Sequence, residues 1–135
     1  MTITPTILPL ELNDVSFEIN GMRYIKEMNL QLTPGFSTVI LGPNGSGKSL
    51  FLRLCHGLLK PTTGSIRWLG PMGKNPKKYQ AMIFQKPIML RRSVIENLRF
   101  GLKSRHISKI KSDPIVDRII EIIGLARLAE TPARS

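Results

Sequence analysis

The feature that most constrains this chain is a glycine-rich loop at residues 42–49, which follows the apolar run Val39-Ile40-Leu41. The loop reads Gly-Pro-Asn-Gly-Ser-Gly-Lys-Ser and fits the phosphate-binding pattern G-x-x-x-x-G-K-[ST]. Its glycines allow a sharp turn, which brings backbone N–H groups around phosphate oxygens at the start of the next helix. Lys48 can neutralise charge on the β and γ phosphates, and the Ser49 hydroxyl can ligate Mg²⁺. The loop therefore predicts binding of a nucleoside triphosphate with Mg²⁺.

The length and composition are those of one globular domain. The chain has 135 residues, of which 41% are hydrophobic, and this is enough for a single core. No stretch approaches 18 consecutive apolar residues, and the N-terminus lacks the basic and apolar regions of a secretory signal. Cys55 lies in an apolar helical stretch, where a buried core thiol is expected rather than a nucleophile. These features predict a cytoplasmic protein.

The net charge of +11 is unevenly distributed along the chain. Between residues 71 and 111 the only acidic residue is Glu96. The basic residues of this stretch are Lys74, Lys77, Lys78, Lys86, Arg91, Arg92, Arg99, Lys103, Arg105, Lys109 and Lys111. Such a patch can face a nucleic acid, an anionic membrane surface, an acidic partner or only solvent. Nucleic acid is disfavoured, because aromatic residues for base stacking are sparse and no recognition motif accompanies them.

Hydrophobic periodicity predicts an antiparallel β layer ahead of the loop. Apolar residues alternate over 10–19, Asn20-Gly21 signals a turn, and strand character returns over 24–32. Residues 36–41 are then predicted to form the strand that delivers the loop. The later elements are expected to be a helix over 47–56 closed by Gly57, a strand over 65–69, a strand over 81–84, a helix over 93–100 and a helix capped by Ser112 or Asp113.

Two capping signals set the expected ends of the last two helices. Ser93 followed by Glu96 has the spacing of a capping box. Pro114 is expected at the first position of the final helix, and Gly124 is expected to close it.

Four stretches together resemble the ATP-binding subunits of ABC transporters. They are Leu-Glu-Leu-Asn-Asp-Val-Ser-Phe at 10–17, Ile-Leu-Gly-Pro-Asn-Gly-Ser-Gly-Lys-Ser at 40–49, Gly-Leu-Leu-Lys-Pro-Thr-Thr-Gly-Ser-Ile at 57–66 and Met-Ile-Phe-Gln-Lys-Pro at 82–87. The resemblance covers essentially the whole chain. It implies an incomplete α/β core of the P-loop NTPase (ABC ATPase) type with an N-terminal antiparallel β layer. The implied divisions are the β layer at 1–36, the P-loop core as far as the Q-loop at 37–90, and the start of the helical subdomain at 91–135.

The resemblance also assigns roles to individual residues. Lys48 and Gln85 would be catalytic, and Ser49 and Gln85 would hold Mg²⁺. The residues implied to bind ATP are Gly42, Pro43, Asn44, Gly45, Ser46, Gly47, Lys48, Ser49 and Leu50.

Two positions depart from the family pattern. Leu50 stands where the family commonly has threonine, so a hydroxyl contact to the α-phosphate would be lost and weaker nucleotide affinity is expected. Ile19 stands near the position of an aromatic residue that stacks on adenine. Phe17 and Tyr24 are the alternatives for that contact.

The resemblance also implies partners and a location. In the family, the region that corresponds to residues 86–98 receives a cytoplasmic helix of the transmembrane permease subunit, and a second ATP-binding subunit completes a dimer. The chain would then lie at the inner face of the membrane, with the basic patch against the permease. The sequence of residues 84–98 most resembles that of importers of oxyanions such as tungstate or phosphate. No nucleic-acid partner is expected.

Two features that the family uses for ATP hydrolysis are absent from the 135 residues. No four-residue apolar run is followed by Asp and Glu, and Leu-Ser-Gly-Gly-Gln does not occur. Glu121 falls in a helical pattern and is expected to be a solvated charge, His56 a helix-end residue and His106 a loop residue. We therefore expect Mg-ATP binding with negligible hydrolysis by this chain alone. The alternative is a non-catalytic fragment or gene remnant. A GTPase or small-molecule kinase is disfavoured, because the guanine-reading Asn-Lys-x-Asp is absent.

Overall fold

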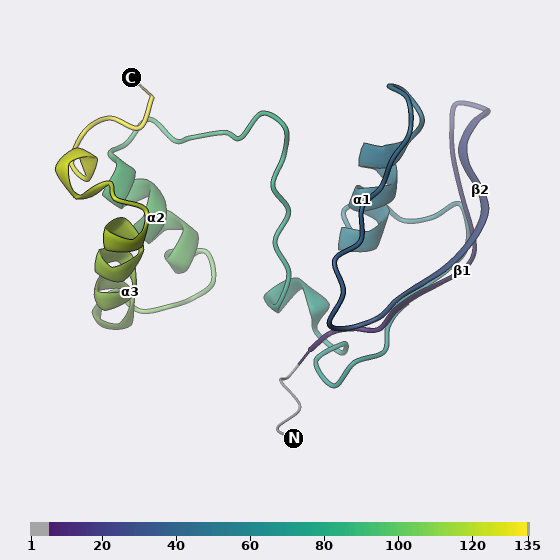
Figure 1. The fold of residues 1–135 in the computed structure, drawn as a ribbon, viewed down its shortest axis with the longest axis horizontal. Helices are drawn as coiled ribbons and strands as arrows, with labels where there is room; N and C mark the ends of the chain where they lie inside the picture. Colours follow the sequence, from purple (N-terminus) through teal and green to yellow (C-terminus); the bar gives the residue numbers. More distant parts are fainter. Residues whose placement is uncertain (1–5, 135) are drawn as a thin grey trace. The chain divides into compact units, whose positions relative to one another are not determined.

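The computed structural model describes residues 6–134, which form two compact units divided between Met82 and Ile83. Figure 1 shows the sheet and helix of the first unit and the packed helices of the second. None of the helices in the described range has the length and apolarity needed to span a bilayer.

The first unit contains a three-stranded antiparallel sheet in the order β2-β1-β3. Its strands are β1 (Leu10–Ile19), β2 (Met22–Leu32) and β3 (Thr63–Trp68). Asn20 and Gly21, which join β1 to β2, both have positive φ, of 50° and 77°. This is the conformation that a two-residue hairpin turn of the Asn-Gly type requires. The predicted β layer and its turn are confirmed, and the short strand expected at 65–69 is found as β3.

An irregularity in β1 explains why its apolar residues change parity. Leu10 and Leu12 are buried, and so are Val15 and Phe17, although strict alternation would place the second pair on the opposite face. The pairing with β2 shifts register between Leu12 and Val15, and Asp14 there has φ of 48°. An extra residue of this kind returns the following side chains to the core face. Asp14 is held by Asn29, whose amide donates to the carboxylate at 2.7 Å.

Helix α1 (Lys48–His56) packs on the sheet and completes the core of the first unit. The buried residues of this core are Leu10, Leu12, Val15, Phe17, Ile25, Phe51, Leu54 and Cys55. Gly57 ends the helix with φ of 77°, and its N–H donates to the Leu54 carbonyl at 2.9 Å. A left-handed glycine at this position is a common helix end. The predicted helix, its end at Gly57 and the buried Cys55 are therefore confirmed. A short 3₁₀ turn, η1 (Pro76–Lys78), lies in the basic loop that follows β3.

The second unit consists of α2 (Val94–Lys103), α3 (Lys109–Ile122) and the 3₁₀ turn η2 (Ala126–Leu128). Its small core contains Ile95, Val116 and Ile120. The predicted capping box is present: Glu96 N–H donates to Ser93 Oγ at 3.3 Å, and Ser93 N–H donates to the Glu96 carboxylate at 3.2 Å.

Two predicted strands are absent from the structure. Residues 36–41 and 81–84 have no regular secondary structure, and Leu41 and Ile83 have exposed fractions of 87% and 91%. A run of β-favouring residues becomes a strand only when a neighbouring strand accepts its hydrogen bonds. No strand in residues 6–134 pairs with either segment. Both segments are apolar and largely exposed, and the prediction that they form strands was wrong.

The predicted start of the last helix was also wrong. Helix α3 begins at Lys109 with Ser108 as its N-cap, so Pro114 lies inside the helix rather than at its first position. Proline lacks the N–H that would donate to the carbonyl of residue 110, so one bond of the first turns is lost. The turn before it still forms, because the N–H groups of Lys111 and Ser112 both donate to the Ser108 carbonyl. Glu121 is exposed on α3 as expected.

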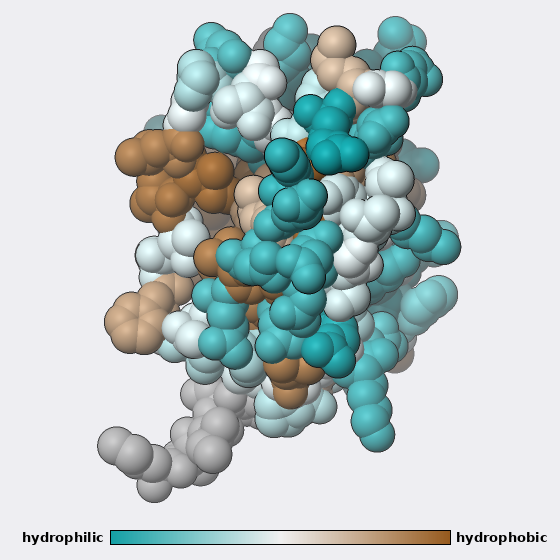
Figure 2. Space-filling view, turned by 90° about the vertical axis from the view of Figure 1, so that its right-hand side faces the viewer, coloured by the Kyte–Doolittle hydropathy of each residue, from teal (hydrophilic) through white to brown (hydrophobic). Residues whose placement is uncertain are grey.

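The outer face on the β2 side of the sheet carries mainly hydrophilic side chains, interrupted by separate apolar groups (Figure 2). The exposed apolar residues of β2 are Met22, Tyr24 and Leu30. The sheet therefore packs one face on α1 and leaves the other face mixed in character.

Candidate functional site

The glycine-rich loop at 42–49 turns through left-handed backbone conformations. Gly45 and Gly47 have φ of 83° and 87°, and Ser46 N–H donates to the Pro43 carbonyl at 3.3 Å. A Cβ atom added to Gly47 would stand 3.3 Å from the Tyr24 carbonyl oxygen. Glycine at position 47 is therefore required both by its φ and by the close approach of β2.

The loop leads directly into the N-terminus of α1, which is not capped by any side chain. Gly47 is the N-cap residue, makes no side-chain cap bond, and the first turn holds no acidic residue. The first bond across the helix start is that from Phe51 N–H to the Gly47 carbonyl, at 2.9 Å. The N–H groups of the first turn and the positive end of the helix dipole are thus directed at whatever lies in the loop. This arrangement suits an anion.

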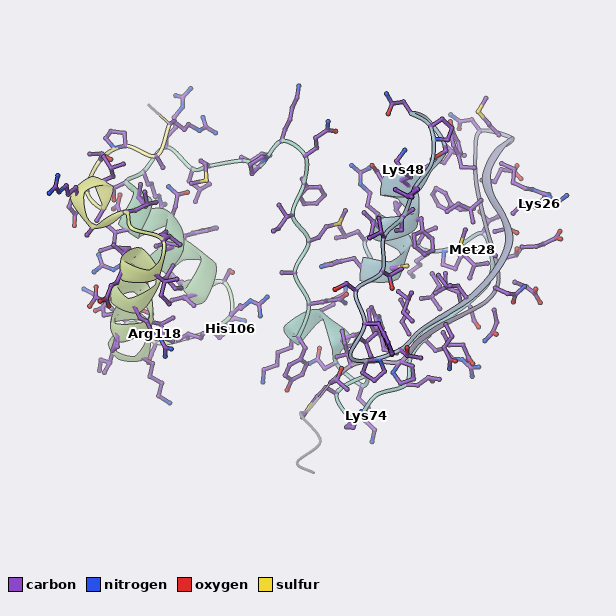
Figure 3. The ribbon with its side chains drawn as sticks, viewed as in Figure 1. Lys26, Met28, Lys48, Lys74, His106 and Arg118 are labelled. Carbon is purple, nitrogen blue, oxygen red and sulfur yellow. The ribbon has the colours of Figure 1, made fainter. Side chains whose placement is uncertain are left out.

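Lys48 supplies the positive side chain of the loop. Its Nζ donates to the carbonyl oxygens of Gly42, at 2.8 Å, and Pro43, at 2.7 Å. These bonds hold the ammonium group over the loop, at the start of α1 (Figure 3). Lys26 on β2 extends away from α1 in the same view (Figure 3). The loop therefore combines backbone N–H donors with a fixed ammonium group.

The next two residues of α1 differ in their surroundings. Ser49 is exposed in the first turn, so its hydroxyl is open to a ligand. A hydroxyl oxygen is a hard donor of the kind that Mg²⁺ accepts. Leu50 is half-buried and packs against the core of the first unit. The side chain at position 50 thus contributes to packing, while its backbone stays in the turn that faces the loop.

A cavity of about 600 Å³ adjoins the loop. It is lined by residues of the loop, of the preceding segment 38–41 and of β2, including Tyr24. Tyr24 has an exposed fraction of 39%, whereas Phe17 is buried in the core. Ile19 is half-exposed at the end of β1, next to the hairpin turn. Of the three side chains considered for a base contact, Tyr24 is the one that lines this cavity.

The other predicted residues lie outside the loop. Gln85 belongs to the second unit and is exposed in a segment without regular structure. Burial raises the pKa of the Cys55 thiol to about 11, so the thiol stays protonated at neutral pH and is no nucleophile. His56 is the last residue of α1 and His106 lies in the turn after α2, as expected. Residues 6–134 hold no group of three His, Cys, Asp or Glu that could bind a metal.

Sequence reasoning missed one grouping of charged side chains. Arg134 is far from residues 91 and 92 in the sequence, yet it lines a cavity together with Arg91 and Arg92, which lie just before α2. The sequence indicated a basic stretch over 71–111, but nothing in it signalled that Arg134 would join these residues.

Comparisons with known proteins agree on one family. The family model described as ABC transporter matches residues 25–135. The cytochrome c biogenesis ATP-binding export protein CcmA of Paramagnetospirillum magneticum is 36% identical over 115 residues, which cover 79% of this chain and 52% of that protein. The taurine import ATP-binding protein TauB of Pelagibacter ubique is 32% identical, with 80% of this chain and 41% of that protein covered. The sulfate/thiosulfate import ATP-binding protein CysA of Mesostigma viride is 31% identical, with coverage of 87% and 35%.

Solved structures show the same fold. An ATP-binding subunit of an ABC transporter superposes with a TM-score of 0.76 at 21% identity, covering 93% of this chain and 54% of that one. The protein cbiO1 from Clostridium perfringens, part of the ABC transporter complex cbiONQ, gives a TM-score of 0.74 at 25% identity, covering 91% and 53%. The fold is therefore that of a P-loop NTPase of the ABC ATPase type, with an incomplete α/β core.

The chain spans about half of the length of these relatives, or less. Its match to the family model nevertheless covers the loop, α1, the part of the first unit from residue 25 onward, and the second unit with the segment around Gln85. The chain belongs to the ATP-binding subunits of the ABC transporter family.

Proposed function

We propose that residues 42–50 bind the triphosphate of Mg-ATP, and that the chain is the ATP-binding part of an ABC transport system. The observation that carries this proposal is the uncapped N-terminus of α1 behind a loop of left-handed glycines. Backbone N–H groups in such a concave loop bind phosphate oxygens without a positive side chain for each one.

Lys48 adds the charge that the backbone lacks. Its ammonium group now donates to two neutral carbonyl oxygens, those of Gly42 and Pro43. Bonds from an ammonium to an ionised phosphate are stronger than bonds to a neutral carbonyl. The arrival of a triphosphate would therefore draw Nζ from these carbonyls to the β and γ phosphates, with little change in the backbone.

The metal would be held by oxygen ligands. Ser49 offers an exposed hydroxyl of the hard type that Mg²⁺ prefers. The assignment of the Gln85 amide oxygen as a second ligand rests on the resemblance to the family. The bound ion would neutralise charge on the phosphates. Leu50 would contribute its backbone N–H to the α-phosphate, and Tyr24 would contact the base from the adjoining cavity.

The proposed organisation follows the family. The β layer would comprise residues 1–36, the P-loop core 37–90 and the start of the helical subdomain 91–135. Residues 86–98 would dock on a transmembrane permease subunit, and a second ATP-binding subunit would complete a dimer. In this organisation the chain would lie in the cytoplasm, peripheral to the inner face of the membrane.

The transported solute is proposed to be an imported oxyanion. This proposal rests on the amino-acid sequence of residues 84–98 and on two relatives that are named as import proteins, one for taurine and one for sulfate/thiosulfate. A third relative is named as an export protein, so the direction needs its own test. The test measures uptake of labelled sulfate and of labelled phosphate by cells with and without the gene. Higher uptake of either ion in cells with the gene supports import. Uptake that is the same with and without the gene, for both ions, contradicts it.

The second candidate function is nucleotide binding without turnover. It is favoured by the absence from the 135 residues of an apolar run followed by Asp and Glu, and of Leu-Ser-Gly-Gly-Gln. Release of phosphate by the pure chain tests this second candidate, which predicts that none is released. Phosphate release by the native chain that is lost in Lys48→Ala would show ATP hydrolysis at this loop and would rule out the second candidate.

The binding proposal is tested with a fluorescent ATP analogue in the presence of Mg²⁺. Lys48→Ala removes one charge-assisted contact to the phosphates and is expected to weaken binding by about 10- to 100-fold. The matched control is Lys60→Ala, an exposed lysine beyond the end of α1, which is expected to leave the affinity unchanged. Equal affinity of the native chain and Lys48→Ala would refute the assignment of the loop.

A further inference from the structure

The first unit contains a second cavity, at the end of α1 that lies away from the phosphate loop. Its volume is about 220 Å³, and its walls come from the end of α1, from β3 and from the turn η1. The lining combines apolar side chains with polar ones, among them Leu54, Ile66, Trp68, His56, Lys60 and Lys77. An apolar cavity of about 150 Å³ holds benzene, so this cavity has room for one six-membered ring.

Hydrogen bonds fix the wall of the cavity that carries Lys77. The Gln80 side-chain amide donates to the His56 carbonyl at 3.3 Å, which joins the loop after β3 to the end of α1. Within that loop, the Tyr79 N–H donates to the Pro76 carbonyl at 2.9 Å and closes the 3₁₀ turn. The lysine therefore projects from a folded turn that is bound to the helix.

A buried nitrogen of His56 has no hydrogen-bond partner. Its Nδ1 atom is the one buried side-chain nitrogen or oxygen in residues 6–134 that no hydrogen bond satisfies. Native proteins seldom leave a buried polar atom unpaired, because its desolvation is then uncompensated. A ligand that carries a hydrogen-bonding atom into the cavity would supply the partner that this imidazole lacks.

The charged groups of the lining are positive. Lys60 and Lys77 are exposed and form no ion pair or side-chain hydrogen bond within residues 6–134. No Asp or Glu of the described residues lines the cavity, and the sequence has none between Glu27 and Glu96. Two ammonium groups without a nearby carboxylate favour an anion.

We propose that this cavity binds a small aromatic carboxylate, of which benzoate is the simplest. The two oxygens of a carboxylate have enough lone pairs to accept from Lys60, Lys77 and the His56 imidazole together. The ring would cover the apolar part of the lining and contact Trp68, since aromatic rings attract one another when they are offset or edge to face. This assignment does not depend on the proposed function, because the cavity shares none of its residues with the phosphate loop.

The test titrates the 135-residue chain with benzoate and follows the fluorescence of Trp68, the single tryptophan of the sequence. Benzamide has the same shape without the charge, acetate has the carboxylate without the ring, and inorganic phosphate is the free-anion probe. Benzoate is expected to bind about tenfold more tightly than benzamide, because it forms charge-assisted bonds. It is also expected to bind about tenfold more tightly than acetate, because the ring buries apolar surface.

The variant Lys77→Gln removes one charge from the lining without breaking a bond within residues 6–134. It is expected to weaken benzoate binding by about three- to tenfold and to leave benzamide binding unchanged. The matched control is Lys74→Gln, an exposed lysine of the same loop that lies outside the cavity lining. This control is expected to bind benzoate like the native chain.

The variant His56→Leu tests the unpaired nitrogen. It removes the imidazole and keeps an apolar side chain at the same place, so urea denaturation is expected to show no loss of stability. Benzoate binding is expected to weaken by about three- to tenfold, because one hydrogen bond to the carboxylate is lost. A folded His56→Leu chain that binds benzoate as tightly as the native chain would remove His56 from the site.

Absence of benzoate binding, equal binding of benzoate and benzamide, or equal effects of Lys77→Gln and Lys74→Gln would overturn the proposal. Binding of acetate or phosphate as tight as that of benzoate would also overturn it, in favour of a general anion site. The fluorescent ATP analogue is expected to bind Lys77→Gln normally. Benzoate binding by a native chain that does not bind ATP would refute the nucleotide assignment and leave this cavity's assignment intact.

Discussion

Gly47 links the phosphate loop to the sheet, because its left-handed φ of 87° coincides with a close approach to the Tyr24 carbonyl. In Gly47→Ala, a left-handed alanine costs about 1–2 kcal/mol, and the added Cβ must also displace β2. We expect the free energy of unfolding to fall by about this amount and ATP affinity to fall with it, as measured by urea denaturation and nucleotide titration.

The control for this substitution is Gly101→Ala. Gly101 lies in α2, and a Cβ there would meet no atom within 4 Å. Alanine in an exposed helix stabilises by about 1 kcal/mol relative to glycine. If Gly47→Ala were as stable as Gly101→Ala and bound ATP normally, the claim that position 47 requires glycine would be wrong.

Leu50 combines a packing role with a proposed ligand contact. Its half-buried side chain packs on the core of the first unit, so Leu50→Thr is expected to lower the free energy of unfolding by about 1–3 kcal/mol. The new hydroxyl would donate to the α-phosphate, and one such bond corresponds to an affinity gain of about three- to tenfold. Calorimetric titration with Mg-ATP and thermal unfolding measure the two effects separately; a loss of affinity in the folded variant would count against the contact.

At the scale of elements, the sequence predicted turns and helix ends correctly, but it did not predict which segments pair as strands. The Asn20-Gly21 turn, the end of α1 at Gly57 and the Ser93–Glu96 capping box depend on residues close in sequence, so their patterns predict them. The segments 36–41 and 81–84 were predicted as strands from their local apolar runs. Whether they pair depends on strands elsewhere, which composition does not reveal.

Helix caps provide a test at this scale. Ser93 accepts a hydrogen bond from Glu96 N–H, whereas Ser108, the N-cap of α3, makes no side-chain cap bond. Ser93→Ala is expected to lower the free energy of unfolding of the second unit by about 1 kcal/mol. Ser108→Ala is expected to change it by markedly less. Chemical denaturation followed by circular dichroism measures both, and equal losses would contradict the assignment of the capping box.

The site shows the same division between local and distant information. The loop at 42–49 was predicted from one contiguous motif, and the structure gives it the turn and helix start that the motif requires. The cavity that Arg134 lines together with Arg91 was not predicted, since the bridge between Ser93 and Pro132 joins parts of the chain that are distant in sequence. Contacts of this kind follow from the packing of α2 and η2 rather than from any local pattern.

At the scale of the whole molecule, exposed apolar segments are the main liability. Leu41 and Ile83 are almost fully exposed on segments that pair with no strand in residues 6–134. Unpaired apolar segments of this kind favour association between chains. Ile83→Lys is therefore expected to reduce concentration-dependent light scattering and to leave ATP affinity unchanged. Scattering equal to that of the native chain would show that this segment does not drive association.

The most direct test of the central claim observes the backbone N–H groups of the loop. Amide chemical shifts of the isotope-labelled chain are recorded during titration with Mg-ATP, and with Mg-AMP as the control that lacks the β and γ phosphates. We predict that the amides of Gly45, Gly47, Lys48 and Ser49 shift with ATP and stay nearly unchanged with AMP. Unchanged loop amides at saturating ATP, or equal shifts with AMP, would contradict the claim that this loop binds the triphosphate.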